Sequence, residues 1–225
     1  MDDLTLFKIA NTEEIAGLEK TILVDDETRQ LAFYSVSPGV VAFGFYMTKG
    51  TFFPPGKDWL NNLRVWKKRE AIGHEIYQAE DGFVLQYTSL RQMILDKIKV
   101  YQPTMIYLSG FSKGAAHATL CMRDLMGQFP RIKLDVTAFG SPRVYSFDSA
   151  LEIDADIQSH PLVRFRRICV SRDPVTKLPP IIFDYRHVGK QTVFGGPKHW
   201  FFSDVKVHDP VVYEAHLKAE NSVES

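Results

Sequence analysis

Residues 104–122 read TMIYLSGFSKGAAHATLCM, and this stretch decides the fold. An apolar run rich in β-forming residues ends in the pentapeptide Gly110-Phe111-Ser112-Lys113-Gly114, and a run of small, helix-forming residues follows. This order predicts a strand, a sharp turn and a helix, with a G-x-S-x-G motif at the turn. Such a turn is crowded, and the two glycines relieve the crowding because they carry no Cβ.

The turn predicts that Ser112 is an exposed nucleophile. The helix that follows directs its free N–H groups and its positive dipole end towards the serine oxygen, which favours an anion at that point. G-x-S-x-G also occurs by chance, and a serine between glycines is commonly a plain turn. The strand before the motif and the helix after it favour the nucleophile.

Apolar runs elsewhere in the chain predict an α/β fold. Residues 31–36 and 40–47 are separated by Ser-Pro-Gly and read as a hairpin. Apolar residues recur every three or four positions over 83–98, which predicts a helix, and strands are expected at 134–139 and 162–170. Strand and helix in alternation predict a mostly parallel sheet covered by helices. Near the N-terminus, Asn11 with Glu14 predicts a short helix over 12–18.

Composition bounds the class of protein. The 225 residues are 45% hydrophobic and carry no formal net charge, which suits one domain over residues 1–225 and, without a basic stripe, argues against a nucleic-acid partner. Cys121 and Cys169 lack metal-ligand spacing and are expected to be buried free thiols. The acidic N-terminus has no apolar core of a signal peptide, and no run approaches 18 apolar residues, so we expect a cytoplasmic protein.

A serine nucleophile needs a base and a group that orients the base. Asp173 follows the strand expected at 162–170, at the sheet edge where such groups lie, although an aspartate before a proline is also a common turn residue. In the chain order Ser…Asp…His, four histidines remain as the base. From the residues alone the choice stays open between His187, His199, His208 and His216.

Several further blocks stand in order along the chain. They are Thr-Ala-Phe-Gly-Ser-Pro-Arg-Val at 137–144, Asp-Pro-Val at 173–175, Leu-Pro-Pro at 178–180, Tyr-Arg-His-Val-Gly at 185–189 and His-Asp-Pro-Val-Val-Tyr at 208–213. These blocks resemble motifs of the class 3 lipase family, the fungal and plant triacylglycerol-lipase type of α/β-hydrolase. The resemblance implies the α/β-hydrolase fold, with helices on both faces of the sheet and an antiparallel hairpin near the N-terminus. It also implies that Asp173 is the triad acid, that His208 is the catalytic histidine and that His187 is structural.

The oxyanion of an acyl-transfer reaction needs at least two hydrogen-bond donors. One is expected to be the backbone N–H of Lys113, directly after the nucleophile. The second is implied by the resemblance, because Lys49-Gly50-Thr51 is similar to the family's oxyanion turn and Thr51 offers an N–H and a hydroxyl. The other interpretation is a glycine turn with an incidental threonine.

The resemblance also implies a mobile lid after the oxyanion turn. Its apolar residues would cover an acyl groove when the lid is closed and touch lipid when it is open. Ordinary core packing by the tryptophan and the last leucine is the alternative. The residues concerned are Phe52, Phe53, Trp59, Leu60 and Leu63.

Five positions depart from the family's pattern without removing a triad residue. Phe111 stands where a histidine is usual, Lys113 where a leucine is usual and Ala115 where a glycine is usual. Glu80 stands where a histidine precedes the long helix, and Lys49 where the oxyanion turn usually has an arginine. The predicted function is a serine esterase or lipase, most simply one acting on acyl esters of glycerolipids, with no metal or organic cofactor. Its predicted partners are a lipid or ester substrate and a transient membrane or lipid-droplet surface. The alternatives are a non-catalytic lipid-binding protein on this scaffold and an acyltransferase to an alcohol other than water.

Overall fold

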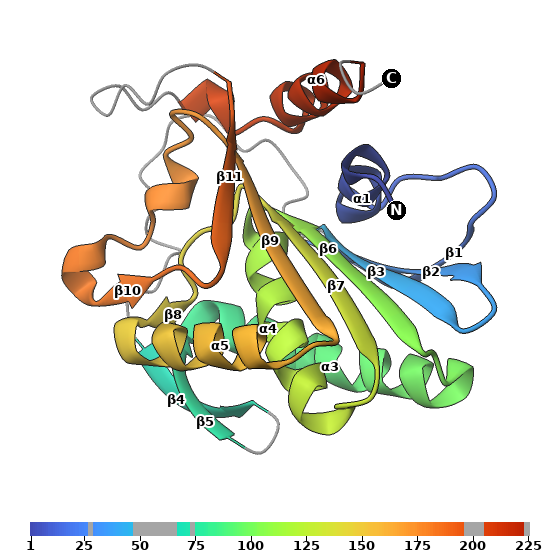
Figure 1. Cartoon of the computed structure of the whole chain (residues 1–225), viewed down its shortest axis with the longest axis horizontal. Helices are drawn as coiled ribbons and strands as arrows, with labels where there is room; N and C mark the ends of the chain where they lie inside the picture. The colour runs from blue at the N-terminus through green and yellow to red at the C-terminus, as the bar shows by residue number, and fades with distance from the viewer. Residues whose placement is uncertain (27–28, 47–66, 73–74, 196–204, 223–225) are drawn as a thin grey trace.

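A seven-stranded sheet forms the centre of the computed structural model, which describes residues 1–26, 29–46, 67–72, 75–195 and 205–222 (Figure 1). The strand order is β1-β2-β3-β6-β7-β9-β11. The first three strands pair antiparallel and the remaining pairs, from β3 to β11, are parallel, so the predicted mixed sheet with its N-terminal hairpin is confirmed. The bounds are β1 Glu19–Asp25, β2 Gln30–Ser37, β3 Val40–Tyr46, β6 Met105–Phe111, β7 Lys133–Phe139, β9 Val163–Val170 and β11 Lys190–Phe194.

Helices cover both faces of this sheet. On one face α3 (Asp81–Tyr101) and α4 (Lys113–Gln128) pack on side chains such as Phe43 and Leu108. On the other face α1 (Asp3–Ala10) and α6 (Pro210–Asn221) enclose a second core that contains the alternate residues of the same strands. Alternation along a strand thus supplies both cores, because successive side chains point to opposite faces.

A smaller four-stranded sheet lies beside the main one and was not anticipated. Its order is β10-β8-β5-β4, and α5 (Phe147–Ser159) follows β8 directly. Two of its strands have only two residues, which is too short for a period-two pattern to be visible in sequence. The bounds are β4 Lys67–Ile72, β5 Glu75–Glu80, β8 Tyr145–Ser146 and β10 Tyr185–Arg186.

The helix predicted near the N-terminus was placed wrongly. Helix α1 precedes Asn11, begins at Asp3 and is capped by Asp2, whose carboxylate accepts from the backbone N–H of Thr5 at 2.8 Å. Asn11 is the C-terminal cap, and residues 12–18 are turns and irregular backbone. Asn11 was predicted as a helix N-cap, but Asp2 is an equally good N-cap. The helix that follows Asp2 has a better apolar face than residues 12–18.

The described residues also include three short 3-10 helices: η1 (Val175–Lys177), η2 (Ile181–Phe183) and η3 (Val205–Val207). Cys121 and Cys169 are buried thiols that are not joined in a disulfide, as predicted. Among the helices of the described ranges, none combines the length and the apolar character needed to cross a bilayer.

Candidate active site

The predicted turn between β6 and α4 has the strained geometry of a nucleophile elbow. Ser112 has φ 57° and ψ −125°, a combination that a serine rarely adopts. A Cβ on Gly110 would lie 2.2 Å from the carbonyl oxygen of Gly114, and a Cβ on Gly114 would lie 1.8 Å from that of Phe45. The two glycines of the motif are therefore required by the close approach of backbone on both sides of the serine.

Ser112, His208 and Asp173 form one hydrogen-bonded chain. The hydroxyl Oγ of Ser112 lies 2.7 Å from Nε2 of His208, and Nδ1 of His208 lies 2.7 Å from Oδ2 of Asp173. Since the carboxylate accepts from Nδ1–H, Nε2 is left as the acceptor for the serine proton. The structure thus brings together the three residues that were predicted as nucleophile, acid and base.

The carboxylate of Asp173 is held by two further donors. The backbone N–H of Val175 donates to Oδ1 at 2.8 Å, and the hydroxyl of Tyr213 donates to Oδ2 at 2.5 Å. The same Oδ2 atom therefore serves both Tyr213 and His208. Tyr213 ends the motif at 208–213, but no role was predicted for it. Its position five residues after His208 was the signal in the sequence that could have identified it.

Aromatic rings fix the plane of the imidazole. The ring of Phe111 stacks on His208 with centroids 4.8 Å apart and 19° between the planes, and Tyr213 meets His208 edge-on at 6.4 Å. Phe7 of α1 in turn contacts the rings of Phe111 and Tyr213 at 5.8 and 6.1 Å. The departure at Phe111 thus places an apolar ring face on the base, and the N-terminal helix supports it.

Ser112 is 2% exposed, whereas the sequence predicted an exposed serine. The prediction was wrong because the strained turn presents Oγ to His208, which is equally buried, and not to solvent.

The helix N-terminus at the elbow offers the predicted backbone donor. Lys113 is the first residue of α4, so its N–H has no acceptor within the helix. Its half-buried side chain has a pKa lowered by desolvation, an effect that the charge of Glu80 partly opposes. Thr51, the predicted second donor, lies outside the described residues, as do the predicted lid residues Phe52, Phe53, Trp59, Leu60 and Leu63.

Glu80 occupies the position where the family usually has a histidine. Its fully buried carboxylate caps α3 by accepting from the N–H of Phe83 at 2.7 Å, while Oε1 has no hydrogen-bond partner among the described residues. Desolvation raises the pKa of Glu80 to about 7. The histidine that is usual at this position is thus replaced by a carboxylate that accepts a hydrogen bond from the backbone N–H of Phe83.

The three other histidines that were candidates for the catalytic base are not part of the triad. His187 Nε2 lies 2.7 Å from the carbonyl oxygen of Thr176, and burial lowers the pKa of this histidine to about 3, which fits the structural role that was predicted. His216 lies on α6 against Gly195, and His199 falls outside the described residues. Within the part of the chain that is described, no cluster of three or more His, Cys, Asp or Glu side chains could hold a metal ion.

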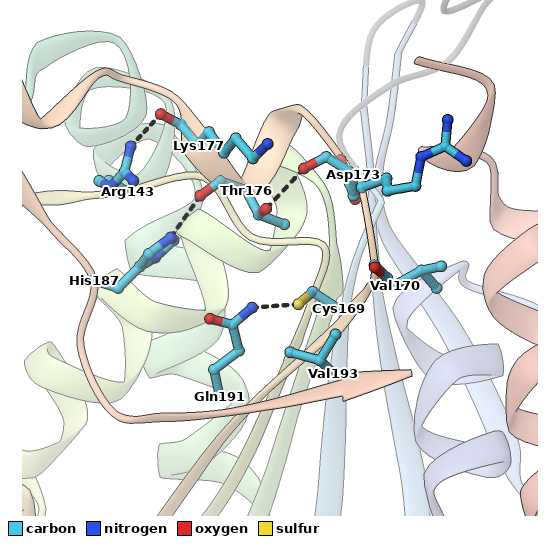
Figure 2. Close-up of a pocket in the computed structure, with 11 residues that line it drawn as sticks. Arg143, Cys169, Val170, Asp173, Thr176, Lys177, His187, Gln191 and Val193 are labelled. Atoms are coloured by element: carbon cyan, nitrogen blue, oxygen red, sulfur yellow. Dashed lines mark hydrogen bonds between the residues drawn. The ribbon is translucent and has the colours of Figure 1, made fainter. Parts of the chain in front are cut away.

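A pocket of about 460 Å³ lies beside Asp173. Figure 2 shows Arg143 and His187 on one side of it and Asp173 with Val170 on the other. Neither Ser112 nor His208 lines this space. The pocket therefore adjoins the triad acid without giving access to the nucleophile, and we do not assign it to the reacting ester.

Known proteins resemble this chain in sequence over about half its length. It is 33% identical over 151 residues to the chloroplastic phospholipase A(1) DAD1 of Arabidopsis thaliana, a match that covers 57% of this chain and 32% of that protein. It is 33% identical over 118 residues to secreted mono- and diacylglycerol lipase 1 of Fusarium solani, covering 50% of this chain and 33% of that protein. The chain thus spans about a third of the length of these relatives.

Solved structures show the same fold. Lipase II from Rhizopus niveus superposes with a TM-score of 0.70 at 16% identity, covering 85% of this chain and 79% of that one. The triacylglyceride lipase of Rhizomucor miehei superposes with a TM-score of 0.70 at 19% identity, covering 92% and 91%. The family described as lipase (class 3) matches residues 46–183, more than half of the chain, a range that includes Ser112 and Asp173 but ends before His208. The chain belongs to the class 3 lipase family.

Proposed function

We propose that this protein hydrolyses carboxylic esters and that its substrates are acyl esters of glycerolipids. The observation that carries the proposal is the chain of two 2.7 Å contacts from Ser112 Oγ through His208 to Asp173. Family membership supports the ester as substrate. Two relatives, named as a phospholipase A(1) and a mono- and diacylglycerol lipase, support a glycerolipid.

The geometry supports acyl transfer in two steps. Ser112 Oγ attacks the ester carbonyl while His208 Nε2 takes its proton, and the same nitrogen then protonates the departing alcohol. Asp173 stabilises the imidazolium that exists between these events. Water, activated by His208 in the same way, releases the acyl group from Ser112.

Charge on the carbonyl oxygen develops at the N-terminus of α4. The N–H of Lys113 supplies one donor there, and the proposed second donor is Thr51. Removal of one such donor in a serine hydrolase costs about 10²–10³-fold in turnover.

A hydrolysis screen tests the proposal. The protein and its Ser112→Ala variant are assayed on p-nitrophenyl butyrate, on mono-, di- and triacylglycerols and on phosphatidylcholine, with free fatty acid as the product measured. We expect hydrolysis of the soluble ester and of at least one glycerolipid, with a loss of about 10⁴-fold or more in Ser112→Ala.

Two results would contradict the proposal. One is equal activity in the variant. The other is a wild-type protein that binds these lipids without releasing fatty acid, which would favour a non-catalytic lipid-binding protein. Fatty acyl transfer to added glycerol in preference to water would redirect the proposal to acyl transfer.

A further inference from the structure

An apolar turn projects from the surface near the loop that carries the triad acid. Ile181, Ile182 and Phe183 of η2 are three consecutive large apolar side chains, with exposed fractions of 66%, 83% and 49%. Phe147 and Leu151, one helical turn apart on α5, are also exposed. In Figure 1 the short helix just before β10 lies at the periphery, away from the central sheet. We call these five residues the apolar turn.

The apolar turn is held rigidly at its base. Arg143 donates from its backbone N–H to the carbonyl of Leu178 at 2.6 Å and from Nη1 to that of Pro179 at 2.7 Å. On the far side, the N–H of Phe147 donates to the carbonyl of Asp184 at 3.1 Å, and β10 pairs with β8. A loop that exposed isoleucines only by fraying would lack such anchors, so the exposure belongs to the folded state.

We propose that the apolar turn inserts into a lipid surface and holds the enzyme beside its substrate, an inference that rests on the proposed function. Exposed apolar side chains grouped on one surface mark an interaction site. Five part-exposed side chains offer only a few hundred Å², well below the ~800 Å² per partner of a stable protein interface. A convex turn with an 83% exposed tip also offers no groove to a protein partner. A lipid surface needs no matching shape, because acyl chains close around whatever enters.

The charges around the apolar turn favour insertion over electrostatic attraction. Arg186 lies over the ring of Phe147, with its guanidinium carbon 4.9 Å from the ring centre. The exposed Asp184 lies between Phe183 and β10, and Asp148 follows Phe147. Because one cation and two anions lie at its rim, the turn should bind a zwitterionic bilayer without requiring anionic lipid.

Insertion would tether the loop that carries the triad acid to the lipid. The loop from Asp173 through η1 leads into η2, and the Arg143 side chain ties the two by bonding the carbonyls of both Lys177 and Pro179. The segment that enters the lipid is therefore joined by a few fixed residues to the carboxylate that orients the base.

A vesicle partition experiment on the full chain tests this inference. Binding to phosphatidylcholine vesicles is measured by co-flotation for wild type, for the double variant Ile181→Ser/Ile182→Ser and for a matched control, Leu85→Ser/Val100→Ser. The control residues lie on α3 and are 48% and 76% exposed, so they test whether any loss of exposed apolar surface has the same effect. We expect the apolar-turn variant to bind at least tenfold more weakly, and wild type and control to bind alike.

Turnover of soluble p-nitrophenyl butyrate separates this inference from the proposed function. The soluble ester should be hydrolysed equally by all three proteins, because the apolar turn contributes no atom to the triad. Equal vesicle binding by all three proteins, or wild-type binding only to anionic phosphatidylglycerol vesicles, would overturn the inference. A wild-type dimer that the turn variant abolishes, seen by light scattering, would also overturn it and make the turn a contact between copies. A wild type inactive on the soluble ester would instead refute the proposed function.

Discussion

Glu80→Gln should stabilise the protein at alkaline pH and leave it unchanged at acid pH. The carboxyl of Glu80 is fully buried and its pKa is raised by desolvation from an ordinary 4.5 to about 7. The folded state therefore keeps a proton that the unfolded chain releases between these values. The stability that this proton confers is complete below pH 4.5 and is lost as the pH rises through 7. The glutamine keeps an oxygen that accepts from the N–H of Phe83 and never ionises.

The expected effect is large enough to measure by thermal unfolding. Each tenfold change in proton affinity corresponds to about 1.4 kcal/mol, so moving the pKa from 4.5 to about 7 is worth about 3 kcal/mol above pH 7. For a chain of this size, 1 kcal/mol shifts Tm by about 2–4 °C. The variant should therefore melt about 6–12 °C above wild type at pH 8 and at the same temperature near pH 4.5.

The measurement is thermal unfolding followed by circular dichroism from pH 4.5 to 8.5. It compares the Tm of wild type, Glu80→Gln and the exposed-site control Glu152→Gln. The charge of Lys113 acts against the raised pKa of Glu80. A Glu80→Gln protein that melts below wild type at pH 8 would show that this attraction outweighs burial and that Glu80 is ionised. A Tm difference that does not vary with pH would also refute the reasoning.

Substitutions at three positions test the contacts of the triad and the proposed second oxyanion donor. Tyr213→Phe removes one of the two donors to Asp173 Oδ2. Since a hydrogen bond to a charged group is worth about 1.5–3 kcal/mol, kcat should fall about 10–100-fold with KM little changed. An unchanged kcat would mean that the hydroxyl has a purely structural role. Phe111→Leu removes the aromatic ring that stacks on His208 but keeps apolar volume, so kcat should fall about 2–10-fold. Phe111→Tyr keeps the ring and should have the wild-type kcat. Equal losses in both variants would show that stacking on His208 does not contribute to kcat. Thr51→Val should lower kcat about 10²–10³-fold if this hydroxyl is the second oxyanion donor; an unaffected rate would place that donor elsewhere.

Sequence patterns close to Ser112 predicted the elbow, but they could not predict contacts between residues far apart in the chain. The glycines of the motif and the apolar strand before it are adjacent to Ser112, so the strained turn could be read directly from residues 104–122. His208 lies 96 residues from Ser112 and 35 from Asp173, and the residues alone left four histidines open. Only the resemblance to known motifs selected among them.

The support around the base could not be read from the sequence. Phe7 reaches Phe111 and Tyr213 because α1 packs on the sheet beside β6, a placement that no local pattern encodes and that the wrongly placed N-terminal helix obscured. The low exposure of Ser112 has the same origin, since a motif specifies a turn but not what packs over it. The predicted oxyanion threonine and lid lie outside the described residues and stay predictions.

The central claim is that Ser112 is a nucleophile activated by His208 and Asp173. The most direct measurement is labelling by a fluorophosphonate, followed by intact-mass and peptide analysis of wild type, Ser112→Ala and His208→Ala. The account predicts one label per wild-type chain, located on Ser112, no label on Ser112→Ala and a labelling rate at least about 10³-fold lower for His208→Ala. A label on another serine, or a His208→Ala protein that labels as fast as wild type, would contradict it.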